Sequence, residues 1–404
     1  MERLISLVGL VLMLTIAFAL SSNRKKINWR TVISGVSLQI FLGLIILKTD
    51  AGQNFFQGAK DVFTAILSYT NAGSQFIFGS LMDGKKHGFI FFTMVLPTII
   101  FTSSLMSVLY HLGIMQFIIK VFAKIMVFVM GVSGAESLAA AANIFAGQTE
   151  APLVVKPYIP KMTNSELLAL MTGGMATVAG GVLAAYVGFG IDAAHLLSAS
   201  VMSAPAALVC AKLMLPETEE SVTQGDIKMD LEKSTVNIVD AAANGAGEGL
   251  KLAINVGAML LSFIALIALF NGFLSWVGGF FDYSQLSLEL ITGYLFSPVA
   301  FIMGVPWSDC QIVGALLGKK LILNEFVAYL DLKEQMANLS DRSIIISTYA
   351  LCGFANFSSI AIQVGGIGVL APGRRKDLAN LGIRSLIAGT LACLMTACIA
   401  GIFI

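Results

Sequence analysis

Residues 143–152, which read NIFAGQTEAP, combine two amides, a hydroxyl, a carboxylate and a proline within a mostly apolar chain. Amide side chains donate and accept hydrogen bonds, and a carboxylate accepts hydrogen bonds or carries a proton. Side chains of these types can bind a polar ligand or a cation. This segment is therefore the first candidate for a binding site.

A second candidate is Glu325, a lone carboxylate in ILNEFVAYL in the other half of the chain. Ionisable residues at membrane depth are functional candidates, because burying a charge there costs about 2.5–3.5 kcal/mol. The pattern alone leaves alternatives open. Glu150 also fits a helix end at the membrane surface, and Glu325 also fits a solvated loop.

A weak internal repeat accompanies these two carboxylates. The segments GMATVAG (174–180) and GFANFSS (353–359) both place glycine, a larger apolar residue, alanine and a small hydrogen-bonding residue within apolar surroundings. Interrupted apolar segments at corresponding positions are the sequence feature that best indicates a transporter's binding site. We therefore expect broken helices here, with the glycines at 173–174 and 180–181 permitting the first break or, alternatively, close helix packing.

The composition defines the class of protein. Hydrophobic residues make up 57% of the 404 positions, charged residues 12%, and the mean hydropathy is +0.85. Soluble domains contain about 45–50% apolar and about 25% charged residues, so the chain is predicted to be a polytopic membrane protein. A net charge of +1 excludes a basic nucleic-acid surface. The five cysteines and three histidines show no metal-ligand spacing, and no nucleophile–base arrangement indicates an enzyme.

Apolar stretches long enough to cross a bilayer need about 20 residues. We predict eight such spans, near 4–21, 31–48, 88–112, 165–188, 192–215, 249–276, 341–371 and 378–403. Two interrupted apolar stretches, 133–164 and 286–328, are expected to enter and leave on one side. We further expect an interfacial helix within 50–86 and an oblique helix over 112–130.

Two basic loops set the expected orientation. Short loops rich in lysine and arginine face the cytoplasm, and the strongest here are NRKKINWR (23–30) and GRRKD (373–377). Eight spans then place both termini on the periplasmic side. The long polar connection 216–249 becomes a cytoplasmic linker, Glu136 is interpreted as a helix-start charge, and Asp309 is expected in a hairpin turn.

Several sequence blocks in this order resemble the conserved blocks of concentrative nucleoside transporters: SGAESLAAAANIFAGQTEAPLVVKPY, MTGGMATVAGGVLAAYV, MGVPWSDC, LILNEFVAY and LCGFANFSSIAIQVGGIG. The resemblance implies an all-α membrane protein with eight transmembrane helices, two re-entrant hairpins and an inverted repeat with broken helices, assembled as a homotrimer in the bacterial inner membrane. We accordingly divide the chain into peripheral scaffold helices (1–130), a first transport repeat (131–215), a polar linker with a scaffold helix (216–285) and a second transport repeat (286–404).

The resemblance also implies the roles of individual residues. Gln148 and Thr149 would hydrogen-bond a nucleobase, with Glu150 helping and Val182 lining the base side. Glu325, Asn356 and Ser359 would bind the ribose, and Phe354 would pack against the nucleoside. The substrate-site expectation therefore comprises Gln148, Thr149, Glu150, Val182, Glu325, Phe354, Asn356 and Ser359.

A coupling ion is implied between the first hairpin and the break in the helix at 165–188. The side chains of Asn143 and Thr177, with the carbonyls of Ala146, Thr177 and Val178, would give the all-oxygen shell that hard cations favour. Sodium is expected, with a proton as the alternative coupling ion. The function expected is sodium-coupled import of nucleosides such as uridine; a passive nucleoside channel is a less favoured alternative.

Overall fold

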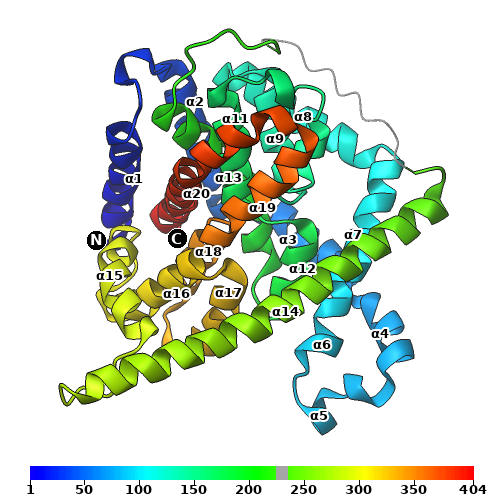
Figure 1. Ribbon diagram of the computed structural model, residues 1–404, viewed down its shortest axis with the longest axis vertical. Coiled ribbons are helices and arrows are strands. Elements are labelled where there is room, and N and C mark those ends of the chain that lie inside the picture. Colours follow the sequence, from blue (N-terminus) through cyan, green and yellow to red (C-terminus); the bar gives the residue numbers. More distant parts are fainter. Residues whose placement is uncertain (224–234) are drawn as a thin grey trace.

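Helices account for all the regular secondary structure in the part of the chain that the computed structural model describes, residues 1–223 and 235–404 (Figure 1). Seven helical segments in this part are long and apolar enough to cross a membrane. The expected all-α membrane class is confirmed. The count of eight spans with two re-entrant hairpins stays a prediction, because the span expected over 341–371 is two shorter helices.

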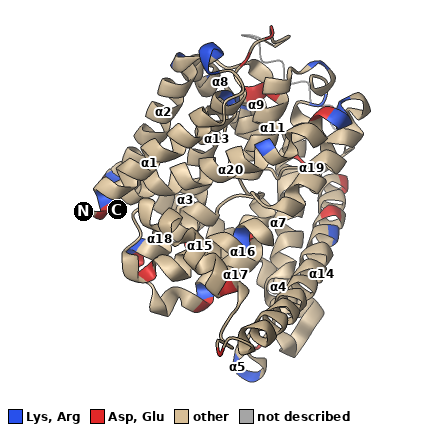
Figure 2. Cartoon of the chain, turned by 60° about the vertical axis from the view of Figure 1, so that its left-hand side comes forward, with Lys and Arg blue, Asp and Glu red and all other residues tan. Residues whose placement is uncertain are grey.

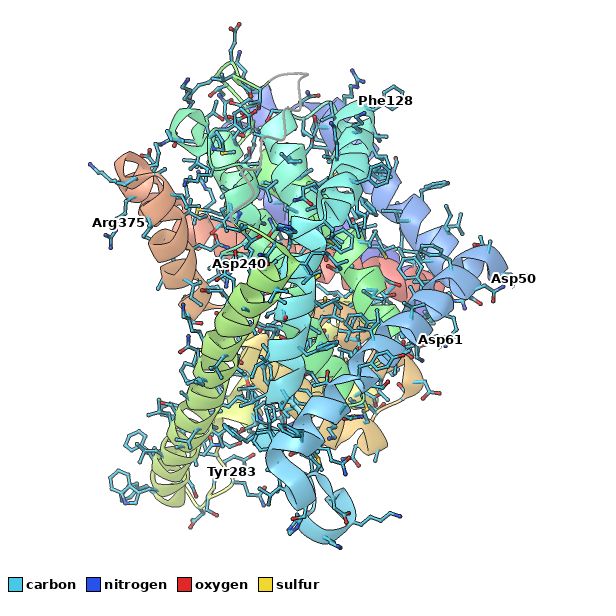
Figure 3. All side chains as sticks on the ribbon, turned by 90° about the vertical axis from the view of Figure 1, so that its right-hand side faces the viewer. Asp50, Asp61, Phe128, Asp240, Tyr283 and Arg375 are labelled. Carbon is cyan, nitrogen blue, oxygen red and sulfur yellow. The ribbon has the colours of Figure 1, made fainter. Side chains whose placement is uncertain are left out.

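Long outer helices carry wide apolar faces on the outside of the fold. They are α1 (Glu2–Ala19), α2 (Trp29–Lys48), α7 (Leu96–His111) and α14 (Ile238–Gly279). The 42-residue α14 is about 63 Å long at 1.5 Å per residue, and it crosses the fold diagonally beside α7 (Figures 1 and 3). A Cβ at Gly245 would lie 2.5 Å from the Ser107 side chain, so the missing side chain allows α7 and α14 to approach closely.

Helix α14 begins earlier than the span expected at 249–276. Asn237 caps it by accepting a hydrogen bond from the Asp240 N–H, and the helix continues from Ile238 without interruption. The polar connection expected over 216–249 is therefore partly helical. Residues 224–234 of that connection lie outside the described residues.

Shorter helices connect the outer ones. The region expected to hold an interfacial helix contains α3 (Asp50–Ser68), α4 (Thr70–Phe78) and α5 (Gly84–His87), followed by α6 (Phe91–Met94). Lys60 of α3 forms a 2.6 Å ion pair with Asp192, which caps α13 (Ala193–Met214). The helix expected over 112–130 is α8 (Ile114–Met130).

Two broken helices and their partners form the buried centre. The first is α11 (Asn164–Ala176) followed by α12 (Gly180–Gly188), and the second is α18 (Asp341–Leu351) followed by α19 (Phe357–Leu370). Helix α13 and helix α20 (Arg375–Phe403) pack around them, and most residues of both helices are buried. The breaks fall at residues 177–179 and 352–356, within the two repeated motifs.

Two further helix pairs carry the remaining polar segments. The first is α9 (Gly134–Asn143) and α10 (Ala151–Val154), joined by the loop 144–150. The second differs from the expected stretch 286–328. Helix α15 (Leu288–Ile302) is a separate element, and the pair next to Glu325 is α16 (Cys310–Ile322) with α17 (Glu325–Gln335).

Asp309 lies in a turn, as expected, but this turn joins α15 to α16 and precedes the helix pair next to Glu325. Asp309 ties the turn to α18. Its carboxylate accepts hydrogen bonds from the Ser343 hydroxyl at 2.6 Å and from the Ser340 hydroxyl and N–H at 2.8 and 3.1 Å. Burial by itself would raise the pKa of Asp309, but the hydrogen bond from Ser343 and those from Ser340 outweigh it, so the pKa lies below its ordinary value.

The two ends of the chain meet at one end of the fold. Arg3 donates a hydrogen bond to the carbonyl of Ile404 at 2.7 Å. The two basic loops contact other helix ends. The N–H of Ser22, beside the first loop, donates a hydrogen bond to the Met214 carbonyl at 2.9 Å, and the Arg374 guanidinium of the second loop donates to the Met162 carbonyl. Most charged segments lie toward the ends of the helices (Figure 2). This arrangement is compatible with a membrane orientation in which both basic loops face one side.

Candidate functional site

The residues expected to bind a ribose come together at the beginnings of two helices. Asn356 is the N-cap of α19, and its Oδ1 accepts the Ser359 N–H at 2.9 Å. Because the oxygen faces the helix, the amide NH₂ points away and donates to Glu325 Oε2 at 3.1 Å. Glu325 is the first residue of α17 and only 4% exposed. The expected group of Glu325, Asn356 and Ser359 therefore lies together in the structure.

Gln148 reaches this group from the loop of the first helix pair. Its Nε2 donates to Ser359 Oγ at 3.1 Å, although the two residues are 211 positions apart. Its Oε1 accepts a hydrogen bond from Gln363 Nε2, also at 3.1 Å. The base-side and ribose-side residues expected from the sequence therefore form one continuous hydrogen-bonded network.

The two helix breaks touch each other directly. The N–H of Phe354 donates to the carbonyl of Thr177 at 3.2 Å. A Cβ at Gly353 would lie 2.8 Å from the Met175 carbonyl, so only glycine permits this crossing of α11 by the second break. Non-helical backbone is tolerated at membrane depth only where protein or a water-filled cavity surrounds it. Each break thus helps to shield the other.

The expected ion ligands lie where α9 and α11 end. Asn143 is the last residue of α9 and 1% exposed; its Nδ2 donates to the Ala139 carbonyl at 3.0 Å, while its Oδ1 has no hydrogen-bond partner. The Thr177 hydroxyl donates to the Gly173 carbonyl at 2.8 Å. The lone pairs of the Thr177 hydroxyl oxygen remain able to accept a hydrogen bond or to coordinate a cation.

Glycine brings these two helix ends together. A Cβ at Gly173 would lie 2.8 Å from the Asn143 amide nitrogen. Helix C-termini carry partial negative charge, which favours a nearby cation. The orphaned amide oxygen of Asn143 and the C-terminal ends of α9 and α11 fit a small cation held by oxygen atoms.

The loop of the first helix pair lies against the first break. Phe145 accepts a hydrogen bond from the Gly180 N–H at 3.0 Å, and a Cβ at Gly147 would lie 3.0 Å from the Ala179 Cβ. Ala146 and Val178 lie in these two segments and are fully buried. The expectation that glycines 173–174 form the break is not met, because they lie inside α11 and permit close packing.

The remaining expected substrate residues surround this network less tightly. Thr149 lies near Gly366 of α19, where a Cβ would be 3.4 Å from the threonine methyl group. Glu150 accepts a hydrogen bond from the Gly147 N–H at 3.2 Å and is exposed, as is Thr149. Val182 is buried on α12. Phe354 is half-buried at the second break.

Two residues of the network were missed by the sequence interpretation. Tyr186 donates to Glu325 Oε1 at 2.9 Å, and Gln363 joins Gln148 to the backbone of α11. Each follows an expected site residue by four positions: Tyr186 follows Val182 and Gln363 follows Ser359. Residues four apart lie on the same face of a helix, so this spacing could have revealed both.

An aromatic cluster closes the site behind Glu325. The ring of Tyr186 lies 4.3 Å from that of Tyr329 and 5.4 Å from that of Phe326, measured between centroids. Phe91 of α6 adds a contact with Phe326 at 5.8 Å. These rings exclude water from one side of the carboxylate, which strengthens its hydrogen bonds.

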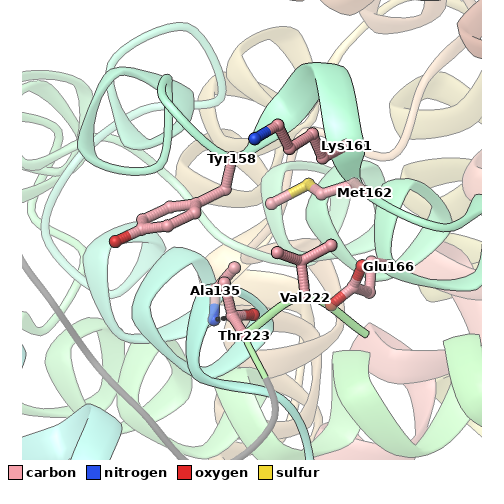
Figure 4. Close-up of a pocket in the computed structure, with 7 residues that line it drawn as sticks. All are labelled: Ala135, Tyr158, Lys161, Met162, Glu166, Val222 and Thr223. Atoms are coloured by element: carbon pink, nitrogen blue, oxygen red, sulfur yellow. Dashed lines mark hydrogen bonds between the residues drawn. The ribbon is translucent and has the colours of Figure 1, made fainter. Parts of the chain in front are cut away.

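A small pocket lies at the base of the first helix pair, apart from this network (Figure 4). It is lined by Ala135, Tyr158, Lys161, Met162, Glu166, Val222 and Thr223. Ser133 and Glu136 form a capping box there, which confirms Glu136 as a helix-start charge, and Glu136 also pairs with Lys212. None of the expected site residues lines this pocket, so we assign it a structural role.

The buried network is suited to binding and not to covalent chemistry. It consists of amides, hydroxyls and one carboxylate, next to a group of oxygen atoms suited to a cation. In the described part of the chain, no cluster of three or more histidine, cysteine or acidic side chains could hold a metal ion. Broken helices around a central polar site, in an apolar helical fold, define a membrane transporter of the secondary type.

Comparisons with known proteins identify the family. Residues 195–401 match the model described as Na+ dependent nucleoside transporter C-terminus, and residues 8–81 match the corresponding N-terminus. Residues 92–193 match the model described as nucleoside recognition. The chain belongs to the family of Na+-dependent, concentrative nucleoside transporters, which are transporters and not enzymes.

Relatives cover the whole chain. An uncharacterized transporter of Haemophilus influenzae is 50% identical over 100% of this chain and 98% of the relative. Human solute carrier family 28 member 3 is 46% identical over 99% of this chain but only 60% of its own length.

Solved structures agree in fold. The structure of CNTnw in an inward-facing substrate-bound state has a TM-score of 0.95 at 48% identity, covering 100% of this chain and 98% of that chain. A variant of CNTnw in an outward-facing state has a TM-score of 0.96 at 47% identity, covering 100% and 99%. These neighbours were captured in both inward- and outward-facing states.

Proposed function

We propose that this protein is a secondary active symporter that imports nucleosides, with pyrimidine nucleosides such as uridine as substrates, driven by the sodium gradient. The observation that carries the proposal is the continuous network from Gln148 through Ser359 and Asn356 to Glu325. It places an amide beside a carboxylate. An amide suits the donor and acceptor edge of a base, and a carboxylate accepts hydrogen bonds from ribose hydroxyls.

Each expected residue has a role in this proposal. Gln148 and Thr149 bind the base, with Glu150 and Val182 beside them, and Glu325, Asn356 and Ser359 bind the ribose against Phe354. In the structure the polar members bond to one another. A bound substrate would replace the hydrogen bonds that these polar side chains make with one another.

The coupling ion in this proposal is sodium, held by Asn143, Ala146, Thr177 and Val178. The unpaired Oδ1 of Asn143 supports it, since a buried acceptor without a partner is rare in native structures. A proton is the alternative, with Glu150 as its carrier, because that carboxylate is exposed at the edge of the network.

Uptake into proteoliposomes tests the function. The purified protein is reconstituted, and accumulation of radiolabelled uridine is followed with an inward sodium gradient, with an inward proton gradient, and with neither. We expect concentrative uptake with sodium alone. Equilibration without accumulation would indicate the passive channel, and accumulation with protons alone would assign the coupling to Glu150.

The proposal extends to the assembly of the protein and its orientation in the membrane. We propose a homotrimer in the bacterial inner membrane, with scaffold helices from residues 1–130 and 216–285 surrounding the transport repeats 131–215 and 286–404. Both termini would be periplasmic, and the hydrogen bond from Arg3 to the Ile404 carbonyl supports their lying on the same side of the membrane. Light scattering of the detergent-solubilised protein tests the trimer, and labelling of single cysteines from each side of the membrane tests the orientation.

A further inference from the structure

Gln363 occupies a position in the network that determines the direction of its hydrogen bonds. It lies on α19, one turn after Ser359, and is 1% exposed. Its Nε2 donates to the Met171 carbonyl of α11 at 3.0 Å. A carbonyl oxygen can only accept, so the NH₂ end of Gln363 must face α11.

This constraint passes along the network to Gln148. The same Nε2 of Gln363 lies 3.1 Å from the Gln148 amide, so the atom that faces it must be the acceptor, Oε1. The NH₂ end of Gln148 is then turned toward Ser359 Oγ. An amide without such a partner can turn over and exchange its donor for its acceptor; Gln148 cannot.

Two groups remain available for a ligand once these bonds are made. Gln148 Nε2 carries a second N–H beyond the one donated to Ser359. Gln363 Oε1 is buried and has no hydrogen-bond partner. Leaving a buried acceptor unpaired is costly, so an unpaired acceptor in a native structure requires an explanation such as a ligand or a water molecule.

Close packing against α11 holds the side chains of Gln148 and Gln363 in fixed positions. A Cβ at Gly174 would lie 2.8 Å from Gln363 Nε2 and 2.9 Å from Gln148 Cβ. The pair therefore rests against α11 at a position where only glycine leaves room. A site that depends on orientation needs this support, because loosely held polar groups do not discriminate between ligands.

We propose that Gln363 is a further substrate-binding residue, which fixes Gln148 as a hydrogen-bond donor and itself accepts an N–H from the nucleobase. The pair then selects a base edge on which an acceptor adjoins a donor, such as the carbonyl and N3–H of uracil. This proposal rests on the proposed function, since it assigns the base half of the same nucleoside site.

The test compares uridine with 3-methyluridine, in which a methyl group replaces the N3 hydrogen. Binding of each is measured by isothermal titration calorimetry at saturating sodium, for the wild type and for Gln363→Met, which keeps length but removes both amide functions. We expect the variant to bind uridine at least about fivefold more weakly, while its affinity for 3-methyluridine changes less than twofold. The preference for uridine should therefore fall by the same factor.

Controls separate this role from a structural one. Gln57→Met makes the same substitution at an exposed glutamine of α3 and should leave both affinities unchanged. In every variant the preference for uridine over 2′,3′-dideoxyuridine should persist, because it reports the ribose half of a folded site.

Each outcome decides the question. If Gln363→Met keeps the wild-type preference for uridine over 3-methyluridine, the proposal is overturned, whether or not both ligands bind more weakly. If the wild type binds no uridine, the proposed function fails first. A wild type that binds uridine with a variant that matches it refutes only the role of Gln363.

Discussion

Replacing Glu325 by glutamine gives the most direct test of the ribose half of the site. The wild-type carboxylate is 4% exposed and accepts hydrogen bonds from Tyr186 at 2.9 Å and Asn356 at 3.1 Å. Glutamine has the same shape. Because the Asn356 NH₂ must face it, the new amide places Oε1 on Asn356 and Nε2 on the Tyr186 hydroxyl, which can accept. We therefore expect the variant to fold.

The size of the expected loss in uridine affinity follows from the loss of the negative charge on Glu325. Hydrogen bonds to charged groups contribute about 1.5–3 kcal/mol, and those between neutral groups about 0.5–1.5 kcal/mol. The loss is therefore about 1–1.5 kcal/mol for each ribose hydroxyl that Glu325 accepts. Two hydroxyls give about 2–3 kcal/mol, which corresponds to uridine binding roughly 30- to 150-fold weaker.

Calorimetric titration with uridine and with 2′,3′-dideoxyuridine measures this directly. We expect Glu325→Gln to lose affinity for uridine and to change by less than about threefold for the dideoxy analogue. Glu334→Gln, at an exposed carboxylate on the same helix, is the matched control and should behave as the wild type. If the wild type binds the two nucleosides equally, or if Glu325→Gln weakens both by the same factor, Glu325 does not hold the ribose.

Three further variants probe the ion site, the packing of the site and a loop. Asn143→Ala should raise the sodium concentration for half-maximal uptake about tenfold without altering base preference at saturating sodium, and an unchanged sodium dependence would remove Asn143 from the ion site. Gly174→Ala places a Cβ 2.8 Å from the Gln363 amide and should cost about 1–3 kcal/mol of stability, seen as a lower Tm, whereas Gly365→Ala has nothing within 4 Å and should be neutral; equal Tm values would contradict the packing. The lowered pKa of Asp309 means that its ionised form stabilises the fold at pH values above the ordinary aspartate pKa of about 3.9, and that this contribution is lost as pH falls through the lower native pKa. The Tm difference between wild type and Asp309→Asn should therefore be constant above about pH 5 and shrink below about pH 4, and a difference independent of pH would refute the assignment.

Local signals account for what the sequence predicted well. The breaks at 177–179 and 352–356 fall within the repeated motifs because these combine small residues with a helix-capping residue, Asn356 in the second case. Helix caps act within a few residues of chain, so they can be recognised without the fold. The gathering of Gln148 with Ser359 was expected only through the family resemblance, because nothing local relates positions 211 apart.

Longer elements were harder to delimit, for physical reasons. The stretch 286–328 looks like one interrupted apolar segment because α15 is as apolar as its neighbours and contains Pro298 within the helix. The start of α14 resembles a linker because its first turns are polar and rich in glycine, yet Asn237 caps a continuous helix there. Helix propensity is a weak guide to where α14 begins, because tertiary packing against α7 decides which residues are helical.

The roles of Gln363 and Tyr186 depend on tertiary geometry in a stricter sense. Their helical spacing identifies the face on which they lie, but not which end of an amide faces the ligand. That direction is set by the Met171 carbonyl, a backbone group whose position no sequence pattern reports. Hydrogen-bond direction in a buried network is a property of the assembled fold. The substrate specificity of this site is therefore harder to predict from the sequence than its helices or its polar residues.

The contact between the two breaks offers a physical basis for coupling ion to substrate. The Thr177 carbonyl, an expected sodium ligand, accepts the N–H of Phe354, and Phe354 is followed two residues later by Asn356, the cap that directs its amide at Glu325. A cation that orders the first break would therefore also order the backbone from which the residues proposed to bind the ribose extend. Such coupling is reciprocal: whatever factor sodium adds to nucleoside affinity, nucleoside must add to sodium affinity. The hydrogen bond between Phe354 and Thr177 cannot account for all of this coupling energy. It does, however, connect the backbone segment expected to hold the ion with the segment expected to hold the sugar.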